Sequence, residues 1–274
     1  MSTPDSNSHI IHRHRHPGYF YPVHLRQRIY GLVILPLVVV IVAMFVLHPQ
    51  GSSSGGDISV FNLAGALGAS LIRLFAAYLF ALVLSLPLAL MINRSSWSER
   101  ILLPTFDILQ SVPVLAFFPV VIIFFVNAQF LEGAAIFIIF INMLWNLVFS
   151  LVGGLRLIPS DINAAAQVFG IRKVAYIRQV HIPSIFPYLV TGSLLAWAEG
   201  WNMLIVAEVL HTYLPGSTSS SDLFGIGSVM VHASANGQTS LFVASIFVMI
   251  IAIAIMNLFV WQRLLKYSER YRFE

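Results

Sequence analysis

The chain has 274 residues, of which 58% are hydrophobic and 9% are charged. Because charged residues supply about a quarter of an average soluble domain, this composition excludes an ordinary soluble enzyme, a disordered chain and a coiled coil. The formal net charge is +4, but the basic residues do not gather on one soluble face, and we expect no nucleic-acid partner. There is no cysteine, which excludes disulfides and thiolate chemistry.

Residues 1–28 form a polar, basic tail without the apolar core and cleavage site of a signal peptide, so we expect it to be retained in the cytoplasm. A histidine-rich tract is typical of metal binding. Alternating arginines would repel a divalent cation, which favours a solvated tail near anionic lipid. We therefore predict no metal site for this tract, whose histidines are His9, His12, His14, His16 and His24.

Six apolar runs follow, each near the length that crosses about 30 Å of hydrocarbon at about 1.5 Å per residue. They occupy residues 29–47, 67–92, 101–126, 134–152, 184–210 and 241–265. The Gly/Ser-rich segment 48–66 predicts a flexible external linker after the first span. We expect an all-α membrane protein with about six transmembrane helices, its core formed by residues 67–274.

The positions of lysine and arginine predict how the spans are oriented, because these residues are retained on the cytoplasmic side. Fourteen of the fifteen lie in the two terminal segments or in the linkers 93–100 and 153–183, and Arg73 is the exception. Linkers that contain none alternate with them, at residues 48–66, 127–133 and 211–240. We expect both termini to be cytoplasmic.

The linker 153–183 has the pattern of two short helices joined by a glycine. Ser160 is a suitable N-cap for the first helix, whose apolar face repeats at Ile162, Ala165, Ala166 and Phe169. Gly170 ends that helix, since glycine adopts the left-handed conformation at little cost. The second helix, 171–180, is expected to end before Pro183. Such a hairpin either docks into a partner protein or lies on the anionic inner leaflet, and the residues alone leave both open.

This linker resembles the signature loop of bacterial ATP-binding-cassette importer permeases. The signature reads E-A-A, three residues, glycine, nine residues and I-x-L-P, and its glutamate is replaced here by Ala164. Docking to the ATPase would then depend on apolar and basic contacts. The positions that match the signature are Ala165, Ala166, Gly170, Val180, Ile182 and Pro183.

Other segments resemble the nitrate, sulfonate and taurine branch of these permeases, and the resemblance covers residues 67–274. They are residues 110–125, the IVAEV stretch with Glu208, the Gly225 to Gly227 triplet and the C-terminal end. The resemblance implies a type I importer fold with a cytoplasmic coupling-helix loop at 153–183, in the bacterial inner membrane. The implied partners are two cytoplasmic ATPases that bind ATP and magnesium, a second permease subunit of the same or a different chain, and an external solute-binding protein.

Ionisable groups at membrane depth are costly unless they face a cavity or a partner, so each is a candidate for the translocation path. Arg73 either attracts an anion, snorkels outward or pairs with a carboxylate. Glu208 lies near the external end of its run, where water could reach it. Glu199 lies nine residues earlier, on a different helical face, either in contact with solute or packed at a subunit seam.

A polar group between two prolines of the third run is a further candidate, unless that part of the run is an interfacial helix. It consists of Asp107, Gln110 and Ser111. Trp201 and Asn202 beside Glu199 complete the candidates for the path.

No P-loop or other catalytic pattern is present, and the only lysines are Lys173 and Lys266, so we expect a non-catalytic chain that holds no cofactor. The sequence favours the permease subunit of an ATP-driven importer, with a small organic or inorganic anion as solute. The alternative is a self-contained secondary carrier or channel.

Overall fold

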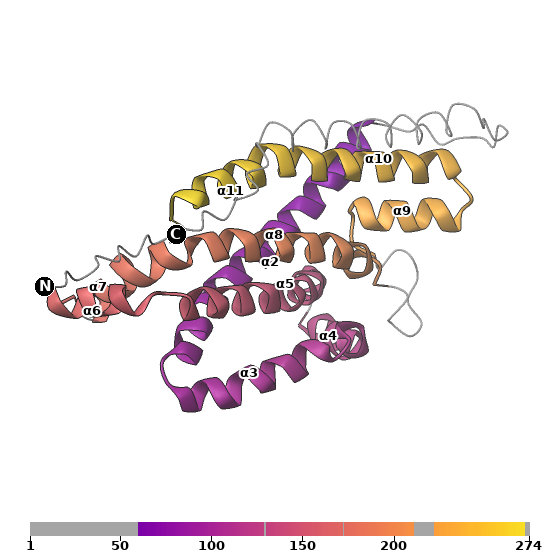
Figure 1. The fold of residues 1–274 in the computed structure, drawn as a ribbon. Helices are drawn as coiled ribbons and strands as arrows, with labels where there is room; N and C mark the ends of the chain where they lie inside the picture. The colour runs from indigo at the N-terminus through magenta and orange to yellow at the C-terminus, as the bar shows by residue number, and fades with distance from the viewer. Residues whose placement is uncertain (1–59, 129, 172, 211–221, 272–274) are drawn as a thin grey trace, which may run out of the picture. The chain divides into compact units, whose positions relative to one another are not determined.

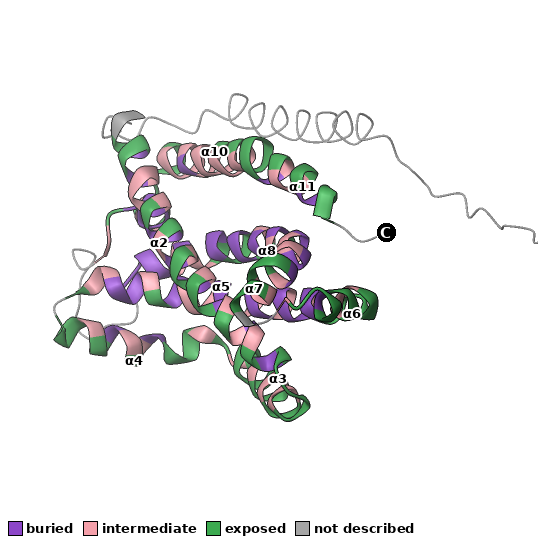
Figure 2. Cartoon of the chain, turned by 90° about the vertical axis from the view of Figure 1, so that its left-hand side faces the viewer, coloured by how far each residue is buried: buried purple, intermediate pink, exposed green. Residues whose placement is uncertain are grey.

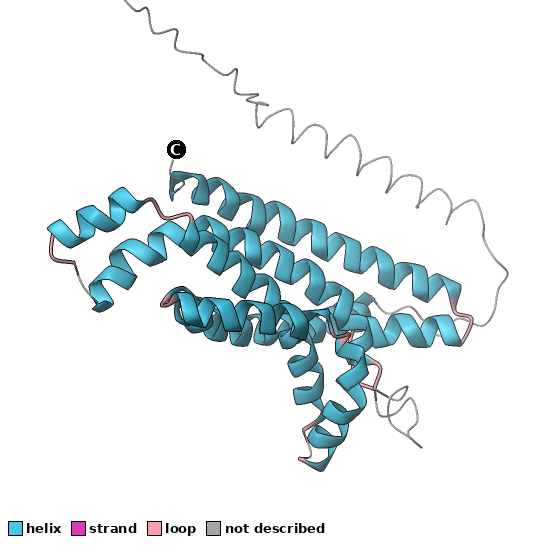
Figure 3. Cartoon of the chain, turned by 60° about the horizontal axis from the view of Figure 1, so that its bottom comes forward, coloured by secondary structure: helices cyan, strands magenta, loops and turns pink. Residues whose placement is uncertain are grey.

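The computed structural model describes residues 60–128, 130–171, 173–210 and 222–271. The chain divides into two compact units, Met1–Ser52 and Ser53–Glu274, and all described residues belong to the second. The predicted tail, the span 29–47 and most of the linker 48–66 lie outside the described residues. Within the described ranges every element is a helix and none is a strand, as expected for an all-α fold (Figures 1 and 3).

Among the described residues, four helices are long and apolar enough to cross a membrane. They correspond to predicted runs, although each helix extends beyond the run at one end or both. The four spans are Asn62–Asn93 within α2 (Val60–Asn93), Leu131–Arg156 (α5), Val174–Glu208 including α8 (Ile182–Glu208), and Thr239–Tyr271 including α10 (Thr239–Met256), η4 (Asn257–Trp261), α11 (Gln262–Ser268) and η5 (Glu269–Tyr271).

The predicted continuous run 101–126 is instead a bent pair of helices. Helix α3 (Ser96–Ser111) begins at Ser95, whose Oγ accepts a hydrogen bond from the Ser98 N–H at 3.1 Å. It meets α4 (Val114–Asn127) at an angle of 85°. Val112 is extended because the ring of a following proline disfavours the helical conformation, and that proline begins α4. The described residues thus hold four spans, or five if the bent pair counts as one.

Helix α5 forms the centre of the bundle and packs mainly against α8 and α2. Figure 2 shows the buried residues concentrated on α5 and α8. Small residues allow this close packing: a Cβ at Gly200 of α8 would lie 2.1 Å from Cε of Met143 on α5, and one at Gly192 would lie 2.6 Å from Cβ of Ser150. Because α5 and α8 fit so closely, their facing side chains hold fixed positions relative to one another.

The helix after Gly170 does not end before Pro183, contrary to expectation. Helix α7 (Lys173–Tyr176) continues through a π-turn, η1 (Ile177–His181), directly into α8. In that turn the Ile182 N–H donates to the Ile177 carbonyl, one residue further back than in an α-helix. Pro183 thus lies inside a continuous helix, directly after a π-turn that already departs from the regular α-helical hydrogen bonding.

Candidate functional site

The loop between α5 and α8 folds as the expected helical hairpin, which we call the α6–α7 hairpin (Ser160–His181). Its first helix, α6 (Ser160–Val168), begins after Pro159, which is the N-cap in place of the predicted Ser160 and makes no side-chain capping bond. Gly170 adopts the left-handed conformation, with φ at +68°. Its N–H donates to the Gln167 carbonyl at 3.0 Å, and the Ile171 N–H donates to the Ala166 carbonyl at 2.9 Å. These two bonds close the end of α6 as a Schellman motif.

The two arms of the hairpin are held together by Tyr176. Its hydroxyl donates to Oδ1 of Asn163 on α6. Its ring meets that of His181 edge to face, with centroids 4.6 Å apart. These contacts join α6 to the π-turn at the start of α8, so a force on α6 reaches α8 through packed side chains.

The turn of the hairpin exposes large apolar side chains. Val168 is 85% exposed, Phe169 80% and Val174 75%, and we call these three residues the hairpin tip. Burying such side chains stabilises a contact by about 1.5–3 kcal/mol each. The tip therefore has the chemistry of a docking surface for a protein partner.

The seven residues predicted for coupling divide into exposed and packed positions. Ala166 and Val180 are buried, so they support the hairpin from within, and Pro183 is half-buried. The exposed positions are Ala164, Ala165, Gly170 and Ile182.

At the other end of α5, a buried cluster surrounds Arg73 of α2. Its Nε and Nη2 donate to the two carboxylate oxygens of Glu132 at 2.6 and 2.8 Å, and its Nη1 donates to Oε1 of Glu208 at 2.7 Å. Arg73 is buried, as is Glu208, whereas the side chain of Glu132 is 46% exposed. Pairing with carboxylates, one of the three alternatives considered for Arg73, is the one observed.

Glu208 is completely enclosed, and water does not reach it as the sequence had suggested. Ser70 Oγ donates to its Oε1 at 2.5 Å, and the Gly227 N–H donates to its Oε2 at 2.8 Å. The Ile226 N–H donates to Ser70 Oγ at 2.9 Å. A Cβ at Gly225 would lie 2.2 Å from the Glu208 carboxylate, so the glycine allows the backbone to close over it. The cluster joins α2, α5, α8 and the start of α9 (Ile226–Ala235).

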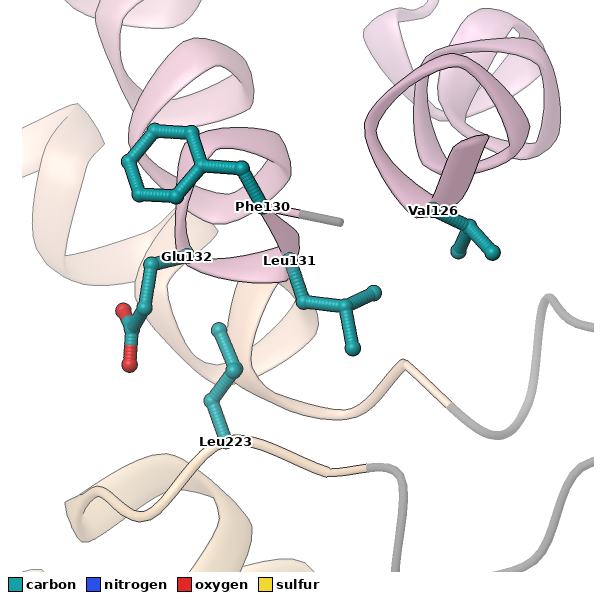
Figure 4. A pocket seen from close by; sticks show the side chains of 5 residues that line it. All are labelled: Val126, Phe130, Leu131, Glu132 and Leu223. Carbon is teal, nitrogen blue, oxygen red and sulfur yellow. The ribbon is translucent and has the colours of Figure 1, made fainter. Parts of the chain in front are cut away.

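A hollow of about 420 Å³ lies beside this cluster (Figure 4). It is apolar apart from the exposed part of Glu132, which Arg73 already neutralises. The hollow therefore offers no free charge for a ligand. Its lining residues are Val126, Phe130, Leu131, Glu132 and Leu223.

The polar group of the third run is exposed and bonded within α3. Gln110 Nε2 donates to Asp107 Oδ1 at 2.9 Å, and Ser111 Oγ donates to the Asp107 carbonyl at 2.7 Å. No residue of α3 is buried. The structure thus does not bring these three side chains to the other predicted path residues.

The remaining path candidates lie on α8 and face in two directions. Trp201 is buried, while Glu199 and Asn202 are exposed. Asn142 Nδ2 on α5 donates to the Glu199 backbone carbonyl at 3.3 Å, and the Glu199 side chain is exposed on the outer face of the described bundle. The expectation that Glu199 and Glu208 lie on different faces agrees with this arrangement.

The family model for the inner membrane component of binding-protein-dependent transport systems matches residues 81–267, well over half of the chain. The chain belongs to this family. The α6–α7 hairpin and most of the bundle fall within the matched residues.

Curated relatives of this inner membrane component include transport permeases for several solutes. The nitrate import permease protein NrtB of Leptolyngbya laminosa is 32% identical over 60% of this chain and 57% of its own length. The bicarbonate transport system permease protein CmpB of Synechococcus elongatus is 30% identical over 54% and 52%. The taurine transport system permease protein TauC of Escherichia coli is 26% identical over 53% and 51%. The chain thus spans about half the length of these relatives.

A solved structure shares the fold of this inner membrane component. A chain in the inward-facing MetNI methionine ABC transporter has a TM-score of 0.64 and 15% identity, with 78% of this chain and 99% of that chain covered. The expected type I importer permease fold is therefore confirmed.

Sequence reasoning about this inner membrane component missed the partners of its charged residues. Glu132 falls within the predicted linker 127–133 and, like Ser70, is not among the predicted candidates. The Gly225 to Gly227 triplet was noted for its resemblance, although its backbone encloses Glu208. The available signal was only that Arg73 is the single basic residue of its run, which predicts a carboxylate partner without saying which one.

Proposed function

We propose that the chain is the transmembrane permease subunit of an ATP-binding-cassette importer. The observation that carries this proposal is the α6–α7 hairpin, whose exposed apolar tip stands at the opposite end of α5 from the Arg73 cluster. A protein partner that covers Val168, Phe169 and Val174 would remove apolar surface from water. The family's description as an inner membrane component agrees with a chain that works with separate subunits.

In this proposal the hairpin end is cytoplasmic and the Arg73 cluster lies at the external end. The distribution of lysine and arginine supports this orientation. Arg156 at the end of α5 also forms an ion pair with Glu99 at the start of α3, which places that charged pair beside the hairpin. Both termini are then cytoplasmic.

The partners are two cytoplasmic ATP-binding-cassette subunits, which bind ATP and magnesium, and a second permease subunit, the same or a different chain. An external binding protein delivers the solute, as the family's description as a binding-protein-dependent system implies. The chain itself carries no P-loop, so in this proposal ATP is hydrolysed by the ATP-binding subunits.

The geometry gives a mechanism for coupling. Residues Val174–Glu208 form one continuous helix, so movement of a subunit bound at the hairpin tip is transmitted along α8. That helix carries Glu199 on its outer face and ends at Glu208 in the external cluster. Movement of the bound subunit at the hairpin tip therefore repositions the α8 residues that border the path.

The solute is a small polar molecule that carries an acidic group. The names of three relatives give their solutes as nitrate, bicarbonate and taurine, and these solutes support the proposed class.

The test is to purify the chain with the ATP-binding subunits of its own host and to replace Phe169 at the tip. Phe169→Asp places a charge in the docking contact, and we expect loss of the bound ATPase with normal membrane insertion. Phe169→Leu is the matched control, because it keeps an apolar side chain, and should retain the complex. Full ATPase binding by Phe169→Asp would overturn the docking claim, and solute uptake by liposomes that contain the chain alone would instead support a self-contained carrier.

A further inference from the structure

Helices α5 and α8 share a polar outer face. On α8 the exposed residues recur at helical spacing, which places them on one side of the helix. Half-buried polar residues of α5 lie beside them at i, i+4 and i+8, joined by the bond from Asn142 to the Glu199 carbonyl. We call the polar members of this set the α5–α8 polar face: Thr191, Glu199 and Asn202 of α8 with Asn142, Asn146 and Ser150 of α5.

Glu199 lies deep within the span. It is nine residues, or about 14 Å, from the end of α8 at Glu208, and farther from Ile182 at the other end. A hydrocarbon core is about 30 Å thick, so the carboxylate is near mid-depth. A charged side chain at that depth must face a partner or a water-filled path.

The carboxylates of Glu208 and Glu199, both on α8, have very different surroundings. Glu208 accepts from Ser70, Arg73 and Gly227. The Glu199 carboxylate has no hydrogen bond or ion pair to any residue that the structure describes. Its charge is therefore uncompensated within the described part of the chain.

Within the membrane-spanning parts of α5 and α8, no basic residue is available to balance Glu199. Residues 131–155 and 184–210 contain no lysine, arginine or histidine. Arg73, the basic residue within the apolar part of α2, is already bonded to two carboxylates. The α5–α8 polar face thus has a net negative charge.

We propose that Glu199 contacts a positively charged nitrogen of the solute, so that the path takes a small zwitterion and rejects simple anions such as nitrate. This inference rests on the proposed importer function. An ammonium group near the carboxylate is attracted, whereas an anion in the same place is repelled, and both effects are large where water is scarce. The acidic group of the solute is then bound by the amide donors of the same face, at Asn142, Asn146 and Asn202.

The absence of cysteine from the chain allows a test that requires no knowledge of the solute. Asn202→Cys places one thiol a single helical turn from Glu199 in the complex with its ATPases. The probes are two methanethiosulfonates of similar size, one with a trimethylammonium group and one with a sulfonate group. The thiolate attacks the reagent's sulfur, forms a disulfide and releases methanesulfinate, and the rate of each reaction is measured.

We expect the cationic reagent to react faster than the anionic one, and the ratio of rates to fall about tenfold when Glu199→Gln is added. An unchanged ratio would overturn the inference. So would a thiol that neither reagent reaches in detergent, where the reagents have access to both sides of the complex, since Glu199 would then be packed at a subunit seam.

Uptake of labelled nitrate and bicarbonate by proteoliposomes that contain the full complex and its binding protein provides the second measurement. We expect uptake of neither anion by the unmodified chain, and nitrate uptake comparable with that of taurine would refute the charge selection. ATP hydrolysis by the bound subunits is recorded in the same samples, because loss of that activity indicates failure of the proposed function, while intact hydrolysis with anion uptake indicates failure of this inference alone.

Discussion

The charge on Arg73 is balanced by residues from two other helices. Its guanidinium bonds both oxygens of Glu132 and one of Glu208, so α2 is joined to α5 and α8 through a single side chain. Replacing a buried ion pair as a whole costs little, but removing one partner leaves an uncompensated charge. The cluster therefore acts as a unit, and its members must be tested together.

We expect Arg73→Met to lower the free energy of unfolding by about 3–5 kcal/mol, because Glu208 would remain charged and enclosed. Thermal unfolding of the purified chain in detergent measures the loss. Adding Glu208→Gln to the same chain should recover part of it, since the amide removes the unpaired charge. Equal unfolding temperatures for the single and double variants would contradict this account of the cluster.

The sequence identified Arg73 and Glu208 as notable, since ionisable groups are rare at membrane depth, but it did not pair them. Which carboxylate lies within reach of an arginine depends on how α2, α5 and α8 pack, and residue spacing contains no such distance. The same limit explains why Glu132 was missed, for it comes at the first turn of α5 in a segment that reads as a loop.

Among the elements, the hairpin was predicted best because its signals are local. The positive φ of Gly170 and the Schellman bonds follow from one glycine after an amphipathic run. The prolines behave differently from one another: the run 101–126 breaks at Pro113, whereas the helix passes through Pro183 without ending. The difference lies in the local backbone, since Val112 before Pro113 is extended while a π-turn precedes Pro183.

Gly170→Ala should strain the hairpin turn by about 1–2 kcal/mol, because an L-residue is disfavoured in the left-handed conformation. We expect weaker coupling, measured as the stimulation of ATP hydrolysis by a loaded binding protein. Gly170→Asn should retain more activity, since asparagine tolerates that conformation better.

The control for the turn is Gly153→Ala in α5, where an added Cβ meets no atom within 4 Å and the backbone is helical. It should leave coupling unchanged. If Gly153→Ala and Gly170→Ala reduced the stimulation equally, the left-handed turn would not be the cause.

At the scale of the whole molecule, the two ends of α5 should face opposite compartments. The hairpin tip follows one end, and the exposed Phe130 precedes the other.

In a chain without cysteine, single thiols report the orientation directly. A membrane-impermeant maleimide should label Phe130→Cys in spheroplasts and Val168→Cys only after the membrane is permeabilised. Both side chains are well exposed in the chain alone, so it is expressed without its ATPase subunits, which would cover Val168. Labelling of Val168→Cys in sealed spheroplasts would reverse the assigned orientation.

The π-turn at Ile177–His181 has a consequence for how such a protein can be tuned. A π-turn contains one residue more than the α-helical turn that it replaces. Deleting one residue there would restore a regular ladder and rotate everything before it by about 100° around the helix axis. The extra residue thus determines the rotation around the helix axis between the hairpin tip and Glu199. Deleting it would change that rotation without lengthening either the span or the tip.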